Sequence, residues 1–390
     1  MLVSNPIAVS SFPCSNVCYQ YLQLLNNQKT DSLATMLTFA HALIHWQTQY
    51  GRHGLPWQGT NDPYAIWVAE IMLQQTQVMT VIPYYQRFLE SFPDVECLAK
   101  APIDAVLALW SGLGYYSRGR NLHKAACLIV ERYQGRFPQH AATIQQLPGI
   151  GRSTAAAIAA FAYGERCAIL DGNVKRVLTR CFGISGYPGE KTTETLLWQK
   201  ADALLPEASD KQQMAAYTQA LMDLGATVCT HHQPKCLSCP LQPDCVAFKE
   251  NRVASLPTPR PRKSLPSRET TFLLLINQDK ILLEKRSSPG IWGGLWCLPE
   301  REIDHNSQAS SLPYFEMDAV PVANLPPLDH AFTHFKLRIY TQLLQVTSRP
   351  CKKMDRAIWV TIDDALQCAI PAPVRKILLK TDFQQQLQTD

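Results

Sequence analysis

The chain of 390 residues has no run of about 18 consecutive apolar residues, so the sequence predicts no membrane-spanning helix. Residues 1–35 lack the basic start and apolar centre of a secretory signal, so secretion is not expected. A strong charge is also missing, because the formal net charge is +5 and charged residues make up 18% of the chain. Such a mild charge permits a polyanionic partner without requiring one. These absences predict a soluble cytoplasmic protein whose ligands must be identified from its motifs.

The cysteines are not distributed as disulfide pairs would be. Of the thirteen cysteines, four lie within residues 229–245, and the others are scattered singly. The four are Cys229, Cys236, Cys239 and Cys245, with six, two and five residues between them. Four thiolates so close together predict one metal site in a reducing compartment. Ligand type alone leaves both zinc and an iron–sulfur cluster open, because both accept four thiolates.

Residues 36–250 are predicted to form a mainly α domain, because apolar residues recur there at helical spacing. Helices are expected around residues 196–205 and 214–224, and Pro83 is expected to start another. Residues 1–35 do not share this pattern and contain prolines and polar residues. We predict that they form a disordered extension or are an artefact of an upstream start codon.

The pattern changes in the last third of the chain. Between residues 251 and 267, prolines alternate with basic residues, which is typical of an extended linker. Beyond it, apolar strands are predicted at 270–276 and 280–286, with a short turn between them. The sequence therefore predicts a separate α/β domain at residues 268–390.

The segment 147–155 contains Gly149 and Gly151, which allow a tight turn and a close approach of another backbone because neither carries a Cβ. The alanine-rich segment that follows predicts a helix whose first N–H groups can bind a phosphate. Asp171 follows a short apolar run, where a chain leaving the core would deliver a carboxylate to a cleft. Taken alone, the glycines are explained equally well by a turn between two helices.

A carboxyl group within an apolar helix is the second informative feature. Glu70 lies three residues from both Trp67 and Leu73, so helical geometry places it on the face that they share. Burial there would raise its proton affinity and make it a candidate general acid, although a surface glutamate is the alternative. The amides of Gln74 and Gln75 follow, and amides can donate and accept hydrogen bonds at base edges.

Several positions allow both a structural and a functional interpretation. The glycine turn at residues 112–116 ends in two tyrosines and precedes Arg118 and Arg120. Arginines suit phosphates, and an aromatic ring can stack on or wedge between bases, but one tyrosine could equally belong to the core. Trp57 either packs in the core or lines a pocket, and Gln219 is either solvated or in contact with a ligand.

Together these motifs resemble the bacterial A/G-specific adenine DNA glycosylases, which belong to the helix-hairpin-helix superfamily. The resemblance extends from about residue 36 to the C-terminus. It implies a helix-hairpin-helix glycosylase domain with a [4Fe–4S] loop at residues 229–245, followed by a Nudix-like recognition domain. The implied partner is double-stranded DNA that contains adenine opposite 8-oxoguanine or guanine, and the enzyme is expected to be a monomer near the nucleoid.

The resemblance also implies a role for each motif. Glu70 would protonate the adenine ring, and Asp171 would stabilise the oxocarbenium-like sugar, since N-glycosidic cleavage needs an acid and an anion. Asn173 and Ser153 would support Asp171 and the sugar. The residues implied to contact DNA or the flipped base are Leu55, Trp57, Gln74, Gln75, Tyr115, Gly149, Gly151, Lys175, Gln219, Phe332, Thr333 and His334.

Two details refine this expectation. Relatives that also cut the strand, such as endonuclease III, have a lysine where Ser153 stands, and a hydroxyl cannot form a Schiff base. We therefore expect base removal alone, with Lys175 able to trap the product only weakly. A working Nudix hydrolase needs a glycine-containing box, yet no glycine follows Gly294, so recognition rather than hydrolysis is expected of this domain. Many relatives have serine where this chain has Thr333, which bears on the discrimination of guanine from 8-oxoguanine.

Two rival hypotheses remain. The first is an endonuclease III-like or thymine-mismatch glycosylase, which Ser153 and the C-terminal domain oppose. The second is a non-catalytic DNA-binding iron–sulfur protein, which the presence of both Glu70 and Asp171 opposes.

Overall fold

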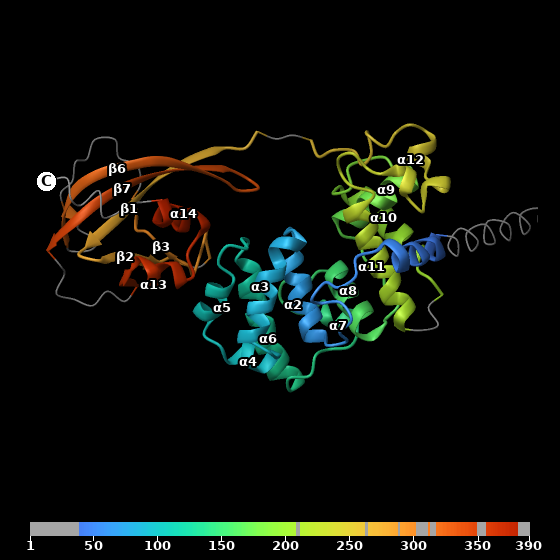
Figure 1. The fold of residues 1–390 in the computed structure, drawn as a ribbon, viewed down its shortest axis with the longest axis horizontal. Helices are drawn as coiled ribbons and strands as arrows, with labels where there is room; N and C mark the ends of the chain where they lie inside the picture. Colours follow the sequence, from blue (N-terminus) through green and yellow to red (C-terminus); the bar gives the residue numbers. More distant parts are fainter. Residues whose placement is uncertain are drawn as a thin grey trace, which may run out of the picture. The chain divides into compact units, whose positions relative to one another are not determined.

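The computed structural model describes most of the chain (Figure 1). The described residues are 39–207, 211–261, 264–287, 289–301, 311–312, 317–348 and 356–380. The predicted extension at 1–35 and the predicted linker residues Arg262 and Lys263 lie outside these ranges. Within them, no helix combines the length and the apolar character needed to cross a membrane.

The described chain divides into two compact units. The first unit comprises the described residues up to His53 together with Tyr163–Pro259. The second unit comprises Gly54–Ala162 and the described residues from Arg260 onward. The helical region predicted at residues 36–250 therefore contributes to both units.

Short, tightly packed helices make up the helical part of the second unit. They are α2 (Pro63–Leu73), α3 (Val78–Ser91), α4 (Val95–Lys100), α5 (Ile103–Leu109), α6 (Ser117–Tyr133), α7 (Ala141–Ile144) and α8 (Arg152–Tyr163). Asp62 caps α2 by accepting hydrogen bonds from the N–H groups of Tyr64 and Ala65. Pro63 fits the first helical position, because the N–H that it lacks would have no partner within the helix.

Pro83 does not start a helix, so that prediction is wrong. It lies inside α3, which begins at Val78. Because proline has no N–H, the carbonyl of Met79 loses its partner one turn earlier in the helix. Met79 is 77% exposed, so water can replace the missing donor.

A mixed sheet and two helices form the C-terminal part of the second unit. The strands are β1 (Ser267–Asn277), β2 (Lys280–Lys285), β3 (Trp296–Cys297), β4 (Glu300–Arg301), β5 (Ser311–Leu312), β6 (Met317–Ala331), β7 (Lys336–Ser348) and β8 (Ala357–Thr361), and the helices are α13 (Ile362–Gln367) and α14 (Ala372–Lys380). Their order is β3-β2-β1-β7-β6-β5, with β4 on β1 and β8 on β2. Only β1 and β7 run parallel among the described pairs. The α/β class and the two predicted strands are confirmed.

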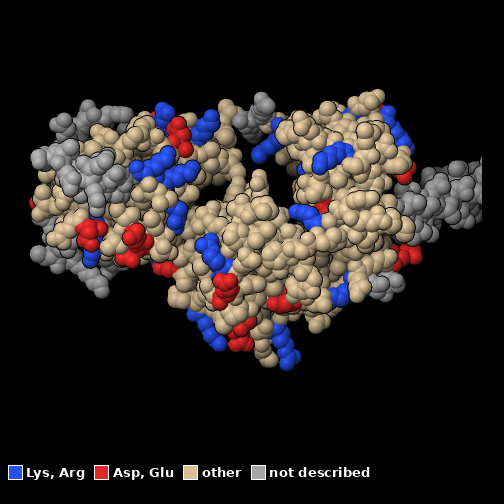
Figure 2. All heavy atoms as spheres, viewed as in Figure 1, with Lys and Arg blue, Asp and Glu red and all other residues tan. Residues whose placement is uncertain are grey.

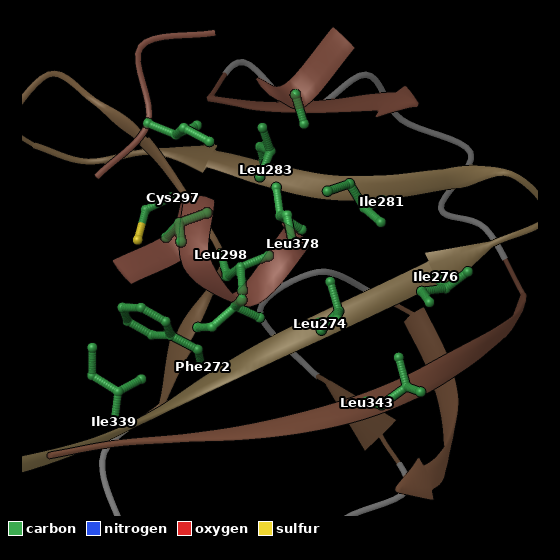
Figure 3. Packing of buried hydrophobic residues seen from close by; sticks show 14 of the residues in the cluster. Phe272, Leu274, Ile276, Ile281, Leu283, Cys297, Leu298, Ile339, Leu343 and Leu378 are labelled. Carbon is green, nitrogen blue, oxygen red and sulfur yellow. The ribbon is translucent and has the colours of Figure 1, made fainter. Parts of the chain in front are cut away.

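The main core of this domain lies between one face of the sheet and α14. Along β1, Phe272, Leu274 and Ile276 alternate onto this face, where they join Leu378 of α14 (Figure 3). The residues between them, such as Leu273, are also buried, in a smaller cluster on the other face. Burial on both faces explains why β1 is nearly uniformly apolar.

The first unit is helical and contains a cysteine-rich loop before its last helix. Residues 39–50 form a helix, and α9 (Gly172–Cys181), α10 (Lys191–Ala203), α11 (Lys211–Thr227) and α12 (Val246–Lys249) follow. The short 3-10 helices η1 (Cys236–Ser238) and η2 (Gln242–Asp244) shape the loop between α11 and α12. The helix predicted around 214–224 lies within α11, and the helix predicted around 196–205 corresponds to α10, which ends at Ala203.

Candidate active site

Asp171 is the N-cap of α9 and is half-buried. Its Oδ1 accepts a hydrogen bond from the backbone N–H of Val174 at 2.8 Å, which fixes the orientation of the carboxyl group. Burial raises the pKa of Asp171, and the hydrogen bonds from Val174 and Asn173 offset only part of this effect. A carboxylate that is costly to ionise gains most from a cation nearby, which suits a role beside a positively charged sugar.

Asn173 lies directly beside Asp171. Its Nδ2 is 3.4 Å from Asp171 Oδ2, and its Oδ1 accepts a hydrogen bond from Arg176 at 2.8 Å. Arg176 also donates to the carbonyl of Gly225 at 2.7 Å. A Cβ on Gly225 would lie 2.6 Å from Asn173 Cβ, so this glycine allows α11 to approach the start of α9 closely. Asn173 is therefore held both by a hydrogen bond and by packing.

Glu70 lies in α2 and is the only carboxylate of that helix. It is half-buried, whereas its neighbours Ala69 and Ile71 are buried and Trp67 is fully buried. The structure thus places one ionisable group within an otherwise apolar helix, as the sequence pattern indicated.

Arg118 is buried in the protein, so its interpretation as a phosphate ligand is wrong. Only 8% of it is exposed. Its guanidinium group donates to carbonyl oxygens at the end of α2, including those of Ile71 at 3.0 Å and Met72 at 2.8 Å. It also donates to the carbonyls of Leu113 at 3.3 Å and Gly114 at 3.2 Å. One side chain therefore ties the end of α2 to the glycine turn that precedes α6.

The two turns joined by Arg118 present the residues expected to wedge into DNA. Gln75 and Tyr115 are exposed, and both have left-handed backbone conformations, with φ of 56° and 47°. Such conformations are uncommon for residues with a side chain and persist where the surroundings enforce them. Gln74 is held differently, because its Nε2 is 3.3 Å from Thr154 Oγ1 in α8.

The hairpin before α8 has one glycine that the fold requires and one that it does not. Gly149 has a φ of 78°, and a Cβ there would lie 2.8 Å from Asn121 Cβ. Gly151 is exposed, and a Cβ there would have no neighbour within 4 Å. The protein itself therefore leaves open space at Gly151, beside the start of α8. Ser153 lies in the first turn of α8 and is half-buried.

Gln219 belongs to a buried polar network that the sequence interpretation missed. Its Nε2 donates to Asp223 Oδ1 at 2.8 Å, one helical turn further along α11. Asp223 is fully buried and pairs with Arg52, whose Nε is also 2.8 Å from Oδ1. Like Glu70, Asp223 is a carboxylate in an apolar helical segment, and this signal could have identified it from the sequence.

Two further predicted site residues, Trp57 and Lys175, contact neighbouring side chains. Trp57 is buried, and its ring meets the edge of Tyr85 with 5.4 Å between the ring centroids. Leu55 is half-buried two residues earlier. Lys175 forms an ion pair of 2.6 Å with Glu194 of α10.

The predicted recognition loop is the tight turn between β6 and β7. Phe332 is half-buried and stacks on Phe335 with 4.4 Å between centroids, and the N–H of Phe332 donates to the carbonyl of Phe335. The two residues between them, Thr333 and His334, are exposed, and Thr333 Oγ1 lies 3.0 Å from His334 Nδ1. The aromatic stack anchors the turn, and its polar tip faces solvent.

The four clustered cysteines line one cavity. Cys229, Cys236, Cys239 and Cys245 surround it together with neighbours such as Arg180. Arg180 is buried and holds the loop by donating to the carbonyl of Thr230 at 2.7 Å. Among the described residues, no three Cys, His, Asp or Glu side chains are arranged to bind one metal ion.

Lysine and arginine side chains are scattered over the face drawn in Figure 2, with many uncharged side chains between them. This distribution agrees with the modest net charge of +5. Any DNA contact on this face therefore depends more on individual side chains and helix N-termini than on a continuous positive surface.

Family models match both parts of the chain. The model of the HhH-GPD superfamily of base excision DNA repair proteins matches residues 68–202, and the NUDIX domain model matches residues 271–380. The adenine DNA glycosylase of Buchnera aphidicola subsp. Baizongia pistaciae is 37% identical over 348 residues, which cover 89% of this chain and 97% of the relative. The chain belongs to the adenine DNA glycosylase family.

More distant members agree with this assignment. The adenine DNA glycosylase of Homo sapiens is 32% identical over 409 residues, which cover 88% of this chain and 74% of the human protein. A solved thermostable thymine-DNA glycosylase is 28% identical, covers 55% of this chain and 97% of its own, and superposes with a TM-score of 0.50. The predicted combination of a helix-hairpin-helix glycosylase fold and a Nudix-like domain is confirmed, as is the prediction of a base excision repair glycosylase that hydrolyses N-glycosyl bonds.

Membership of the family does not by itself assign the site residues. Asp171, Asn173 and Gln219 belong to the first unit, and Glu70 and Ser153 belong to the second. Each unit therefore carries part of the predicted set of site residues.

Proposed function

We propose that this protein removes adenine that is mispaired with 8-oxoguanine or guanine in duplex DNA, and leaves the strand uncut. The observation that carries the proposal is Asp171, a half-buried carboxyl group at a helix start, oriented by Val174 and supported by Asn173. Cleavage of an N-glycosidic bond generates positive charge on the sugar, and an oriented carboxylate stabilises that charge. No charged residue other than Glu70 is available on α2 to act as the acid.

The reaction needs two carboxyl groups with different roles. Glu70 protonates a ring nitrogen of adenine, which makes the base a better leaving group. Asp171 remains ionised, stabilises the oxocarbenium-like sugar and orients the water that attacks it. The burial that raises the pKa of Asp171 also strengthens its attraction for the sugar cation.

Base removal without strand cleavage follows from the chemistry of Ser153 and Lys175. A serine hydroxyl at the start of α8 cannot form a Schiff base with the sugar, whereas a lysine amine could. Lys175 carries an amine, but its ammonium group is paired with Glu194 at 2.6 Å. Release of this amine would require the ion pair to break.

DNA is held by backbone groups and by exposed side chains. The open space at Gly151 and the first N–H groups of α8 suit a phosphate, with Gly149 providing the turn. Gln75 and Tyr115 insert beside the base that loses its partner, and Leu55 and Trp57 form part of the wall of the adenine pocket. Gln74 and Lys175 complete the contacts that we assign to DNA, and Gln219 contacts the edge of the flipped adenine. The protein acts as a monomer in the cytoplasm, at the nucleoid.

The turn at Phe332, Thr333 and His334 is the proposed reader of the opposite base. The stacked Phe332 and Phe335 fix the turn, so the hydroxyl and imidazole groups at its tip are available to a base edge. This arrangement supports a recognition role for the C-terminal domain.

We assign a [4Fe–4S] cluster to Cys229, Cys236, Cys239 and Cys245. The four residues line a single cavity in the loop between α11 and α12, and four thiolates are the usual ligand set of such a cluster. Four thiolates also bind zinc, and the resemblance to the adenine DNA glycosylases favours the cluster. When bound, the cluster would link the segments of this loop and would take no part in the hydrolytic step.

A single-turnover assay tests the proposed function. The substrates are duplexes with adenine opposite 8-oxoguanine, adenine opposite guanine, and thymine opposite guanine. We expect adenine release by the wild type, no strand cleavage without added base, and strong loss of activity in Glu70→Gln and Asp171→Asn. Thymine release instead of adenine release, or adenine release that persists in both variants, would contradict the proposal.

A further inference from the structure

Asp223 is a fully buried carboxyl group with a complete set of donors. Its Oδ1 accepts from Arg52 Nε at 2.8 Å, from Arg52 Nη2 at 2.7 Å and from Gln219 Nε2 at 2.8 Å. Its Oδ2 accepts from the backbone N–H of Arg52 at 2.8 Å. Three of these four contacts come from one residue, so Arg52 prevents the carboxylate from rotating.

This network determines which way the amide of Gln219 faces. A carboxylate paired with a guanidinium group only accepts hydrogen bonds, so the amide must present its NH2 group to Asp223. Because the two amide groups diverge from one carbon, Gln219 Oε1 then points away from Asp223. Gln219 is half-buried, so part of its side chain is open to a ligand. Without this constraint, the amide of a glutamine could flip and present either its oxygen or its NH2 group to a ligand.

We propose that Asp223 is a positioning residue that makes Gln219 specific for a 6-amino group. The inference rests on the proposed function, in which Gln219 contacts the edge of the flipped adenine. Adenine carries an NH2 donor at C6, which matches the oriented amide oxygen. Guanine and hypoxanthine carry an oxygen at C6, so two acceptors would face each other. The network therefore favours 6-aminopurines and disfavours 6-oxopurines.

The test compares two substrates in two proteins. Duplexes carry adenine, or purine without any group at C6, opposite 8-oxoguanine, and base release is measured under single-turnover conditions. In Asp223→Asn, the new amide can donate to Gln219 and therefore allows the amide of Gln219 to flip. We expect adenine release to slow about tenfold, as loss of an oriented hydrogen bond implies, and purine release to slow less than about twofold. Dividing each variant rate by the wild-type rate removes the difference between leaving groups. Equal slowing on both bases would show a merely structural role and overturn the inference.

Hypoxanthine opposite 8-oxoguanine provides a measurement in the opposite direction. When the Gln219 amide has flipped, its NH2 group can donate to the 6-oxo group of hypoxanthine. We expect the ratio of hypoxanthine release to adenine release to rise about tenfold in Asp223→Asn. An unchanged ratio would contradict the orientation argument.

A second variant keeps the test valid if Asp223→Asn does not fold. Gln219→Met retains Asp223 and Arg52, and we expect it to reduce the preference for adenine over purine by the same factor. In the double variant, Asp223→Asn should reduce this preference no further, because the group it acts through is gone. An undiminished preference in Gln219→Met would overturn the inference without any data on Asp223. Asp202→Asn, an exposed carboxylate on α10, is the matched control and should leave the preference unchanged.

The outcomes separate this inference from the function on which it rests. A wild-type protein that releases no adenine would refute the proposed function. A wild-type protein that releases adenine, with no coupling between Asp223 and the 6-amino group, would refute only the role of Asp223.

Discussion

Arg118 in the second unit and Asp223 in the first are both buried charges, yet their partners differ in kind. Arg118 donates to carbonyl oxygens of two separate turns, whereas Asp223 accepts mainly from the side chains of Arg52 and Gln219. Burial of a charge is costly unless hydrogen bonds compensate it, so each network must be nearly complete. The first network fixes the course of the backbone, and the second fixes the orientation of a side chain. Loss of Arg118 should therefore affect stability, and loss of Asp223 should affect selectivity.

A second carboxyl group, Asp171, extends this comparison to the reaction itself. Unlike Asp223, it has neutral hydrogen-bond donors as its nearest partners, from Val174 and Asn173. In Asp171→Asn we expect single-turnover release of adenine to fall by about 10³-fold, because stabilisation of the sugar cation is lost. A rate within about tenfold of the wild type would exclude Asp171 from the mechanism.

The same variant should be more stable than the wild type, although it is expected to be less active. Since the folded pKa of Asp171 is raised, its ionisation opposes folding, and its contribution to stability is lost as pH rises through that pKa. Asparagine is also a good N-cap, so Asp171→Asn should unfold at a higher urea concentration than the wild type at neutral pH. The difference should shrink as pH falls towards the ordinary pKa of an aspartate. A variant that is less stable than the wild type at neutral pH would contradict this account.

Arg118→Met tests whether this buried arginine is structural. The substitution keeps a long apolar side chain but leaves the carbonyls of the two turns without their donor. We expect the free energy of unfolding to fall by about 3 kcal/mol, measured by urea denaturation. Burial lowers the pKa of Arg118 to about 10, so the guanidinium group stays charged at pH 7 and the loss should not vary around neutrality. Arg132→Met, on the same helix but exposed, is the control, and an equal effect in both variants would contradict the prediction.

Gly225→Ala tests whether packing supports the site beside Asp223 on α11. The added Cβ would lie 2.6 Å from Asn173 Cβ, so either α11 or the start of α9 must move. We expect a loss of about 2 kcal/mol in stability and slower adenine release, with the preference for adenine over purine preserved. Ala226→Ser, at an exposed neighbouring position, should change neither quantity. A loss of the preference itself would mean that Gly225 and Asp223 do not act separately.

The sequence was most informative where one residue departs from the pattern of its neighbours. Glu70 and Asp171 stand out because each is a carboxylate beside an apolar run, and the four cysteines stand out by their spacing. Asp223 follows the same rule but needed the structure to show its link with Arg52, because 171 residues separate the two in the chain.

The role of Arg118 could not be predicted, because the type of residue does not reveal burial. An arginine beside glycines and tyrosines suits both a phosphate and a set of backbone carbonyls, and only the fold decides between them. Pro83 shows the same limit for local structure, since α3 continues through this proline one turn after the exposed residue Met79.

The smallest expected effect concerns backbone strain at Gln75, which lies in one of the two turns that Arg118 joins. Gln75 has a φ of 56°, a conformation that costs a residue with a side chain about 1 kcal/mol more than glycine. In Gln75→Gly we expect the free energy of unfolding to rise by up to about 1 kcal/mol, although the greater freedom of glycine in the unfolded chain offsets part of the gain. Binding to a duplex with adenine opposite 8-oxoguanine should weaken in the same variant, because the side chain that we propose inserts into the DNA is gone. Gln145→Gly, at an exposed position where the backbone is helical with φ of −62°, should lower stability instead. If both variants lowered stability equally, the turn at Gln75 would hold no strain, and Arg118 would do no more than satisfy carbonyls.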